Sequence, residues 1–386
     1  MTSRARLAVA AAFASQGLML LGLTTRLPAF ADRWSLSEVE ISGLLLLNVL
    51  GAGAGSVLAE RAAARRPSSQ VLRLGLVVGA LGVLALTLAP ALPVFVAAMA
   101  VYGLGLGVVD AGTNMQAVAL EHRLDRPVLP SSHAAWTAGG IAGSAFTLAT
   151  GTLGVQVLAV LVLVPLAAAC GPFLAREEVP ASAQEAVLDP APVPWRPLWL
   201  VGTCLVVFYL VDTATTTWSA LYLDSVVTTP DRLLAVAALP YLLATLAIRL
   251  AGDGLVARHG PVPVLRTGAV VGCAGLVVVV TAPTWPVVVI GFLVTGLGVG
   301  VVAPLSFSAA ARIAGGSRAR VDAVIGRFNL FNYAGALLGA VLTGVIGRND
   351  LRLGFALPMV LVLVLLPLAP AFGRRREASE PSRAAP

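Results

Sequence analysis

The chain has 386 residues, of which 58% are hydrophobic and only 12% are charged, and its mean hydropathy is +0.90. Soluble domains average about a quarter charged residues, so this composition excludes an ordinary soluble enzyme, a disordered chain and, despite the net charge of +7, a nucleic-acid binder. Apolar runs of about 20 residues recur along almost the whole chain and predict an all-α polytopic membrane protein.

The N-terminal segment begins with Arg4 and Arg6 and continues as an apolar run over residues 7–27. Its first part, with Ala12-Phe13-Ala14, has the features of a signal peptide with a small-residue cleavage site. The run is long enough to cross a bilayer, however, so we predict an uncleaved first helix.

A window of about 20 residues, moved along the chain, predicts twelve transmembrane helices. Those of the first half cover residues 7–30, 40–60, 71–89, 93–120, 132–151 and 153–174. Those of the second half cover residues 198–223, 233–256, 264–281, 285–311, 325–346 and 351–372. The tightest connections contain proline, as in Ala89-Pro90 and Ala282-Pro283, which favours a helix end there.

All 26 basic residues are arginine, and their positions predict the orientation in the membrane. If the N-terminus is cytoplasmic and the spans alternate, all but six arginines lie in cytoplasmic segments or at cytoplasmic helix ends. The exceptions are Arg26, Arg33, Arg232, Arg249, Arg348 and Arg352. This is the positive-inside asymmetry of membrane proteins. We therefore expect both termini in the cytoplasm, and we interpret the high pI as a signal of topology.

Residues 176–197 differ from the rest because they hold four acids and five prolines. Such a segment has too little apolar surface to pack and too many prolines to be helical throughout. We predict a cytoplasmic linker. It divides the chain into an N-terminal six-helix half (1–175), the linker (176–197), a C-terminal six-helix half (198–373) and a basic cytoplasmic tail (374–386).

The two halves are copies of one unit when the sequence is shifted over itself by half its length, which we call the half-length shift. The segment Val71–Gly75 then lies on Val264–Gly268, with Arg73 on Arg266. Glu60 falls on Asp253 and Arg65 on Arg258, and the Gly-rich segment 103–107 falls on 296–300. A parallel repeat of six spans is one architecture of transporters, which bind substrate between the halves.

The loops that follow the second and eighth spans, residues 55–66 and 252–266, each combine an acid with arginines. Both resemble degenerate forms of the acidic–arginine loop signature of the major facilitator superfamily, and the chain resembles this family over nearly its full length. The resemblance implies two pseudo-symmetric six-helix bundles. It also implies that Glu60 and Asp253 pair with arginines such as Arg65 and Arg258 and latch the halves in an outward-open state. Carboxylate–guanidinium pairs are strong enough for this role.

A second resemblance is narrower. Residues 110–121 and 132–140 look like a bacterial branch of the family related to fucose permeases, whose members are largely proton-coupled permeases or exporters. It implies a proton-binding carboxylate in the fourth span, which Asp110 matches by position and type. Asn114 shares the helix face of Asp110, and Asn114 and Gln116 are candidate substrate contacts. A structural hydrogen bond to a neighbouring helix is the alternative for Asp110.

Charged residues within spans are costly and are candidates for function. Asp212, near the middle of the seventh span, is a second candidate for proton coupling. Tyr209, Thr213, Thr216 and Ser219 form a polar stripe on its helix. Trp218 near the outer end could stack on a substrate or belong to an interfacial aromatic belt.

Two arginines within spans allow more than one interpretation each. Arg249 can pair with Asp253 at i+4 as a gate element, which we favour, or reach Asp212 across the cavity. Arg26 can hold an anionic substrate, contact Asp32 in an outer gate, or extend to the outer membrane interface.

The remaining candidates are uncharged or aromatic. Asn329, Asn332 and Tyr333 form a hydrogen-bonding face on the eleventh span that suits either substrate contact or helix packing. His133 and Trp136, near the cytoplasmic start of the fifth span, could form an inner gate, although a lone histidine is more often structural.

We expect no cofactor and no metal. The Gly-rich segments lie in apolar helices without the strand and acid of a dinucleotide fold, a chain without lysine has no Walker lysine, and the three cysteines have no metal or redox spacing. The sequence thus predicts a transporter and not an enzyme: a monomer in the bacterial cytoplasmic membrane that moves a small organic solute with protons. Export of a metabolite or drug is the first interpretation and uptake of a sugar-like solute the second. A non-transporting or lipid-moving membrane protein is the third.

Overall fold

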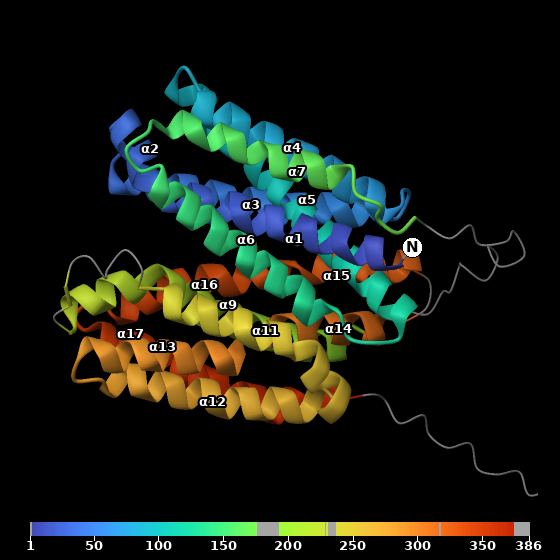
Figure 1. The fold of residues 1–386 in the computed structure, drawn as a ribbon. Helices are drawn as coiled ribbons and strands as arrows, with labels where there is room; N and C mark the ends of the chain where they lie inside the picture. The colour runs from blue at the N-terminus through green and yellow to red at the C-terminus, as the bar shows by residue number, and fades with distance from the viewer. Residues whose placement is uncertain (1, 176–192, 228, 231–236, 316–317, 374–386) are drawn as a thin grey trace, which may run out of the picture.

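The computed structural model describes residues 2–175, 193–227, 229–230, 237–315 and 318–373. The predicted basic tail, most of the predicted linker, Arg232 and the first residues of the predicted eighth span lie outside these ranges. Within them, every regular element is a helix. The helices of the two halves form two bundles that lie side by side (Figure 1).

The helices of the first half are α1 (Thr2–Thr25), α2 (Leu27–Trp34), α3 (Glu38–Ala63), α4 (Ser68–Leu88), α5 (Leu92–Leu124), α6 (Leu129–Ala149), the 3₁₀ helix η1 (Val155–Val162) and α7 (Leu163–Ala169). Those of the second half are α9 (Trp195–Ser225), α11 (Leu239–His259), α12 (Pro261–Thr281), α13 (Trp285–Val299), α14 (Val302–Ala314), α15 (Arg318–Phe328), α16 (Leu330–Ile346), α17 (Leu351–Leu361), η3 (Val362–Val364), α18 (Leu365–Leu368) and η4 (Ala369–Phe372).

Ten helical segments of the described chain are long and apolar enough to cross a membrane. Helix α6 and the shorter apolar segment Val155–Ala169 occupy the places of the other two predicted spans. The prediction of an all-α polytopic protein is therefore confirmed. The first predicted span, 7–30, ends earlier than expected, because α1 ends at Thr25 and the short helix α2 follows.

Helix positions repeat under the half-length shift. The shift places both ends of α4 on the ends of α12, and it places the start of α5 on the start of α13. The packing repeats as well, since Gly105 of α5 lies against the backbone of Gly79, and Gly298 of α13 lies against that of Gly272. A methyl group at either Gly105 or Gly298 would collide with the facing helix. The two halves therefore share their helix packing as well as their sequence pattern.

Two long spans of the second half are interrupted. Helix α13 ends at Val299 and α14 begins at Val302. Pro304 has no backbone N–H, so the carbonyl of Gly300 is left without its helical donor. Helices α15 and α16 meet at Asn329, where Asn332 donates its backbone N–H to the Asn329 carbonyl at 3.1 Å in a tightened turn. Both interruptions lie next to the polar groups described below.

Candidate functional site

Asp110 of α5 reaches out of the first half and is bonded by side chains of the second. Its Oδ2 accepts hydrogen bonds from Asn329 Nδ2 at 2.8 Å, Asn332 Nδ2 at 2.9 Å and the Tyr333 hydroxyl at 3.0 Å. The side-chain amide of Gln16 in α1 makes a further polar contact with this carboxylate. Asp110 is 8% exposed. We call these five residues the Asp110 cluster.

The chain brings these donors together by local structure. Asn329 lies in the break between α15 and α16, and Asn332 and Tyr333 follow at i+3 and i+4, so all three share one face. The predicted hydrogen-bonding face of the eleventh span is thus placed on Asp110. All four donors are neutral, and no ion pair of the described residues includes Asp110.

Two amide oxygens of the Asp110 cluster have no hydrogen-bond partner within the described chain, Gln16 Oε1 and Asn329 Oδ1. Gln16 is 4% exposed and Asn329 is fully buried. The Asn329 amide donates through Nδ2 to the carboxylate and leaves its oxygen unsatisfied, and the Gln16 amide interacts with the same carboxylate while its Oε1 is unsatisfied. A buried acceptor without a donor is destabilising, so these oxygens mark a place that a donor can fill.

Asp212 of α9 is a second acid near the seam between the halves. Its Oδ1 accepts a hydrogen bond from the Tyr241 hydroxyl of α11 at 2.8 Å. Arg249 of α11 lies close enough to attract it electrostatically. Tyr209 is half-buried and interacts electrostatically with Asp110, Asp212 and Arg249. Tyr209 therefore interacts with both acids and links the surroundings of Asp110 to those of Asp212.

Arg249 is buried and crosses to the first half. Its Nε donates to the Gly300 carbonyl at 2.8 Å, the acceptor that Pro304 leaves free. Its Nη1 donates to Thr137 Oγ1 at 2.6 Å and to the His133 carbonyl at 3.5 Å, both in α6. The local pair of Arg249 with Asp253 that we favoured is wrong in this conformation, because Asp253 bonds other groups and the tertiary acceptors hold Arg249.

His133 and Asn114 link this arginine to the helix of Asp110. Asn114 Nδ2 donates to the Asp110 backbone carbonyl at 2.9 Å, and its Oδ1 lies 3.2 Å from His133 Nε2. The His133 ring packs between Phe13 and Phe307, with centroid distances of 5.0 and 6.0 Å. His133 therefore has both a packing role and a polar contact with the fourth span.

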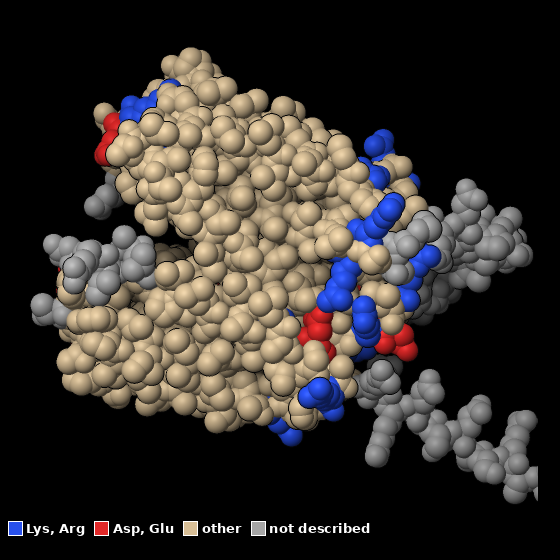
Figure 2. Space-filling view, viewed as in Figure 1, with Lys and Arg blue, Asp and Glu red and all other residues tan. Residues whose placement is uncertain are grey.

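Ion pairs join the halves at the end of the bundle that carries the N-terminus, which we call the charged end. Arg6 Nη2 lies 3.0 Å from Asp253 Oδ2, and Asp253 Oδ1 accepts the backbone N–H of Ser131 at 3.0 Å. Arg327 donates through Nη2 and Nε to the two oxygens of Glu60, at 2.6 and 3.1 Å. Figure 2 shows charged residues gathered at this end and a hollow between the two lobes at the opposite, distal end.

The predicted latch acids therefore pair across the halves and not with their own loop arginines. Arg65 and Arg258 are exposed, and neither forms an ion pair with any described residue. The latch partners Arg6 and Arg327 belong to helices of the opposite half. The prediction of a pairing within each loop is wrong for this conformation.

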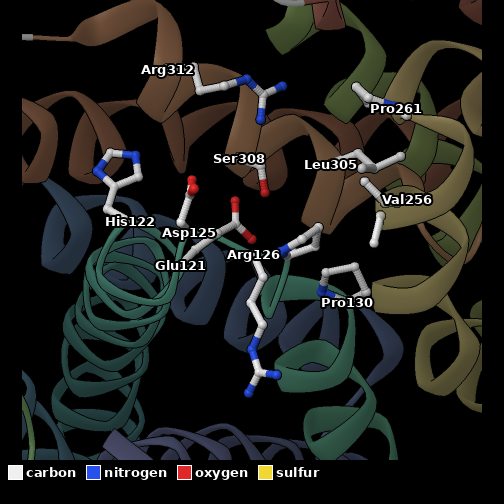
Figure 3. Close-up of a pocket in the computed structure, with 13 residues that line it drawn as sticks. Glu121, His122, Asp125, Arg126, Pro130, Val256, Pro261, Leu305, Ser308 and Arg312 are labelled. Atoms are coloured by element: carbon white, nitrogen blue, oxygen red, sulfur yellow. The ribbon is translucent and has the colours of Figure 1, made fainter.

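A cavity of about 570 Å³ lies between the halves near the charged end. Figure 3 shows Glu121 and Asp125, at the end of α5, facing Ser308 and Arg312 of α14 across it. Glu121 Oε2 also accepts the backbone N–H groups of Val128 and Leu129, which holds the turn before α6. The cavity thus follows the seam between the halves.

Four predicted site residues lie apart from the Asp110 cluster. Arg26 donates to the backbone carbonyls of residues 150, 151 and 153 at 2.7 to 3.0 Å and so caps the end of α6. Gln116 bonds Ser68 and both backbone groups of Leu174. Trp218 Nε1 donates to the Ala340 carbonyl at 3.0 Å, and Trp136 packs on the hydrophobic core. Each has a structural contact in this conformation.

Sequence reasoning missed six residues that make these contacts: Gln16, Arg6, Arg327, Tyr241, Thr137 and Ser56. Gln16 is the one strongly polar side chain of residues 7–25, which is a usable signal because such side chains are costly in a membrane. Ser56, whose Oγ donates to the Gly326 carbonyl at 2.8 Å, is related to Arg249 by the half-length shift. The other four carry no pattern that names their partners.

Comparison with known proteins fits this geometry. A family model described as Major Facilitator Superfamily matches residues 228–386. The uncharacterized transporter y4wD of Sinorhizobium fredii is 28% identical over 366 residues, covering 94% of this chain and 96% of the relative. The membrane protein MosC of Rhizobium meliloti is 24% identical, covering 97% of this chain and 91% of the relative.

Solved structures share the fold at low sequence identity. FucP in its outward conformation is 14% identical with a TM-score of 0.75, over 96% of this chain and 98% of FucP. The human organic anion transporter MFSD10 is 14% identical with a TM-score of 0.76, over 95% of this chain and 99% of MFSD10. With the family model and the relatives, they confirm the predicted fold: the chain is a multi-pass membrane protein with the fold of the major facilitator superfamily, its second half matches that family's model, and it is similar over nearly its full length to a bacterial transporter.

Proposed function

We propose that the chain is a proton-coupled secondary active transporter that moves a small organic solute by alternating access, with Asp110 as the proton carrier. The observation that carries this proposal is the position of Asp110. Its carboxylate belongs to the first half, and the donors Asn329, Asn332 and Tyr333 belong to the second. The protonation state of one group therefore acts on the contact between the halves.

The chemistry of a carboxyl group gives the coupling. An ionised carboxylate is acceptor-only and accepts all these hydrogen bonds, and bonds to a charged acceptor are roughly twice as strong as neutral ones. A protonated Asp110 becomes a donor at one oxygen and a weaker acceptor at the other. Its neutral partners must then rearrange, which loosens the bonds between α5 and α15–α16. Proton binding would thereby favour separation of the halves on this side.

The proposal includes a topology. All twelve predicted segments cross the cytoplasmic membrane of a bacterium, the charged end and both termini face the cytoplasm, and the chain works as a monomer. The domain boundaries are those of the sequence analysis, with the halves at 1–175 and 198–373. The ion pairs Arg6–Asp253 and Glu60–Arg327 then close the cytoplasmic side, as expected of an outward-facing state.

Export of a small organic metabolite or drug is the direction we propose. Uptake of a sugar-like solute is the second candidate, because amide and tyrosine groups such as those of Asn332 and Tyr333 also suit hydroxyl groups. FucP is described as a fucose:proton symporter and XylE as a proton:xylose symporter. Both directions need the same proton site, so one experiment tests both.

The test uses conformation as its readout and needs no known solute. Spin labels on the variants Leu153→Cys and Asn349→Cys, at exposed positions on the distal ends of the two halves, report their separation across a pH series in liposomes. The native cysteines Cys170, Cys204 and Cys273 are first replaced by serine or alanine. We expect the distance distribution to change with pH, and Asp110→Asn to hold the acidic distribution at every pH.

Asp224→Asn is the matched control, because Asp224 is an exposed acid at the distal end of α9. It should retain the pH response of the parent protein. A distance distribution that responds to pH equally in the parent and in Asp110→Asn would show that Asp110 is not the proton carrier.

A further inference from the structure

Asp110 and Asp212 differ in the charge that surrounds them. Asp212 has Arg249 as an electrostatic partner and the Tyr241 hydroxyl as a donor. Asp110 has only neutral donors among the described residues. A buried charge needs a partner or is neutralised. Asp110 therefore lacks one unit of positive charge that either a proton or a bound cation can supply.

The two unsatisfied oxygens add a second requirement. Gln16 Oε1 and Asn329 Oδ1 are buried acceptors without a donor, and both residues interact with the carboxylate, Asn329 through a hydrogen bond from its Nδ2. Only a hydrogen-bond donor can satisfy them. An anionic solute would meet one carboxylate and two acceptor oxygens, which is unfavourable on every count. The Asp110 cluster is thus built to receive a group that is positive and carries N–H bonds.

We propose that the transported solute is an organic cation with N–H donors, a protonated amine or a guanidinium compound, held by Asp110, Gln16 Oε1 and Asn329 Oδ1. The Tyr333 hydroxyl donates to this carboxylate and Tyr209 interacts with it electrostatically, and the aromatic faces of such residues favour cations. This inference rests on the proposed function, because it assigns the solute class to the same proton site.

Competition for one carboxylate sets the direction of transport. A cation that binds ionised Asp110 excludes the proton, and a proton that binds excludes the cation. Each transport cycle would then exchange one proton for one cation, so an inward proton gradient drives export. The titratable side chains that face Asp110 are Tyr209 of α9 and Tyr333 of α16; Gln16, Asn329 and Asn332 do not titrate.

The experiment measures binding to the purified full-length protein in detergent by titration calorimetry. Benzylguanidinium is the probe, because it stays charged across the working pH range and has N–H donors. Benzyltrimethylammonium keeps the charge without N–H bonds, 2-phenylacetamide keeps the N–H bonds without charge, and D-fucose represents the sugar class. We expect benzylguanidinium to bind at least tenfold more tightly than each of the other three.

Variants assign the binding to the Asp110 cluster. Asp110→Asn should lower the affinity for benzylguanidinium by about a hundredfold. The affinity of this variant should also no longer fall at acidic pH. Gln16→Met keeps the side-chain volume but removes the acceptor, and should lower the affinity of the parent protein about tenfold. Gln16→Glu adds a charge and should raise it. Asp224→Asn should bind like the parent, and each variant is first checked by size-exclusion elution for folding.

The outcomes separate this inference from the proposed function. If D-fucose binds and benzylguanidinium does not, or if benzyltrimethylammonium binds as tightly as benzylguanidinium, the solute class is wrong while the proton site stands. Absence of binding by benzylguanidinium at any pH likewise overturns the solute class. A pH-independent distance distribution in the spin-label experiment overturns the proton site itself, whatever the probes do.

Discussion

Helices α3 and α11 each contact the opposite half through two residues one turn apart, at positions related by the half-length shift. The residue types at these positions differ: Ser56 and Glu60 in α3, and Arg249 and Asp253 in α11. Ser56 and Arg249 are related by the half-length shift, and so are their acceptors, the carbonyls of Gly326 and His133. Ser56 and Arg249 are both buried. One half therefore makes this contact with a neutral hydroxyl and the other with a guanidinium.

Proline explains why the second half needs the larger cation. Pro304 removes the donor for the Gly300 carbonyl, and Arg249 Nε supplies it. The first half has Gly107 and Ala111 at the corresponding positions, and its helix α5 continues through them, so the backbone N–H of Ala111 is available to the Gly107 carbonyl. The proline in α14 thus explains why the neighbouring helix α11 has an arginine where α3 has a serine.

Glu60 and Asp253, the acids one turn further on, have different partners because the helices that they face begin at different points of the repeat. Helix α6 begins at Leu129, so the N–H of Ser131 is a free donor of its first turn, and Asp253 accepts it. Helix α15 begins at Arg318, one turn earlier in the repeat, so Glu60 faces a completed helix and pairs with Arg327 instead. The repeat fixes where the halves touch, and local helix ends decide how.

Arg249→Ser makes the second copy match the first and should have the largest effect. It removes hydrogen bonds from a buried cation to Gly300, Thr137 and His133 and leaves Asp212 without its compensating charge. We expect a loss of about 3 kcal/mol in the free energy of unfolding. Unfolding in mixed detergent micelles measures it.

Pro304→Ala is the partner variant that tests the reason. It returns a backbone donor to the Gly300 carbonyl, so Arg249→Ser should cost less in that background, by about 1 kcal/mol. Equal costs of Arg249→Ser with and without Pro304 would show that the free carbonyl does not explain the arginine.

The sequence predicts the helix positions and the polar groups within single helices better than the contacts that these groups make with the opposite half. The half-length shift, visible in Val71–Gly75 and Val264–Gly268, gives the helix positions of α4 and α12. The grouping of Asn329, Asn332 and Tyr333 follows from helical spacing, and Asp110 stands out as a charge within a span. Each of these signals lies within one segment or in the repeat.

Partners across the halves depend on tertiary structure and escape such reasoning. Spacing at i+4 favours a pair of Arg249 with Asp253, but Arg6 and the start of α6 compete for the acid. Pro304 shows from sequence that a carbonyl is left free, and nothing in the sequence says that an arginine of another helix binds it. Likewise Gln16 is visible as a polar residue, while its contact with Asp110 requires the packed bundle.

Ser56→Ala tests the neutral copy and should have an intermediate effect. The hydroxyl donates one hydrogen bond to the Gly326 carbonyl, which lies in the last turn of α15, where carbonyls lack an intrahelical donor. We expect a loss of about 1 kcal/mol in the same unfolding measurement. Ser56→Cys, which keeps the volume and a weak donor, is the control and should lie between the parent and Ser56→Ala. A loss as large as that of Arg249→Ser would mean that the two copies contribute equally despite their chemistry.

The exposed ion pairs should contribute least to stability and differ in their response to salt. Arg6 and Arg327 have relative side-chain exposures of 38% and 53%, so each pair is screened by solvent and contributes roughly 0.5–1 kcal/mol. Asp253→Asn also weakens a bond to the Ser131 N–H of α6, which salt screens little because that N–H is part of the helix end. We therefore expect Glu60→Gln to lose most of its effect at 1 M NaCl and Asp253→Asn to retain about half, measured as unfolding free energies at 0.1 and 1 M NaCl. Equal salt dependence would place both acids in the same kind of contact and remove the distinction that the helix ends provide.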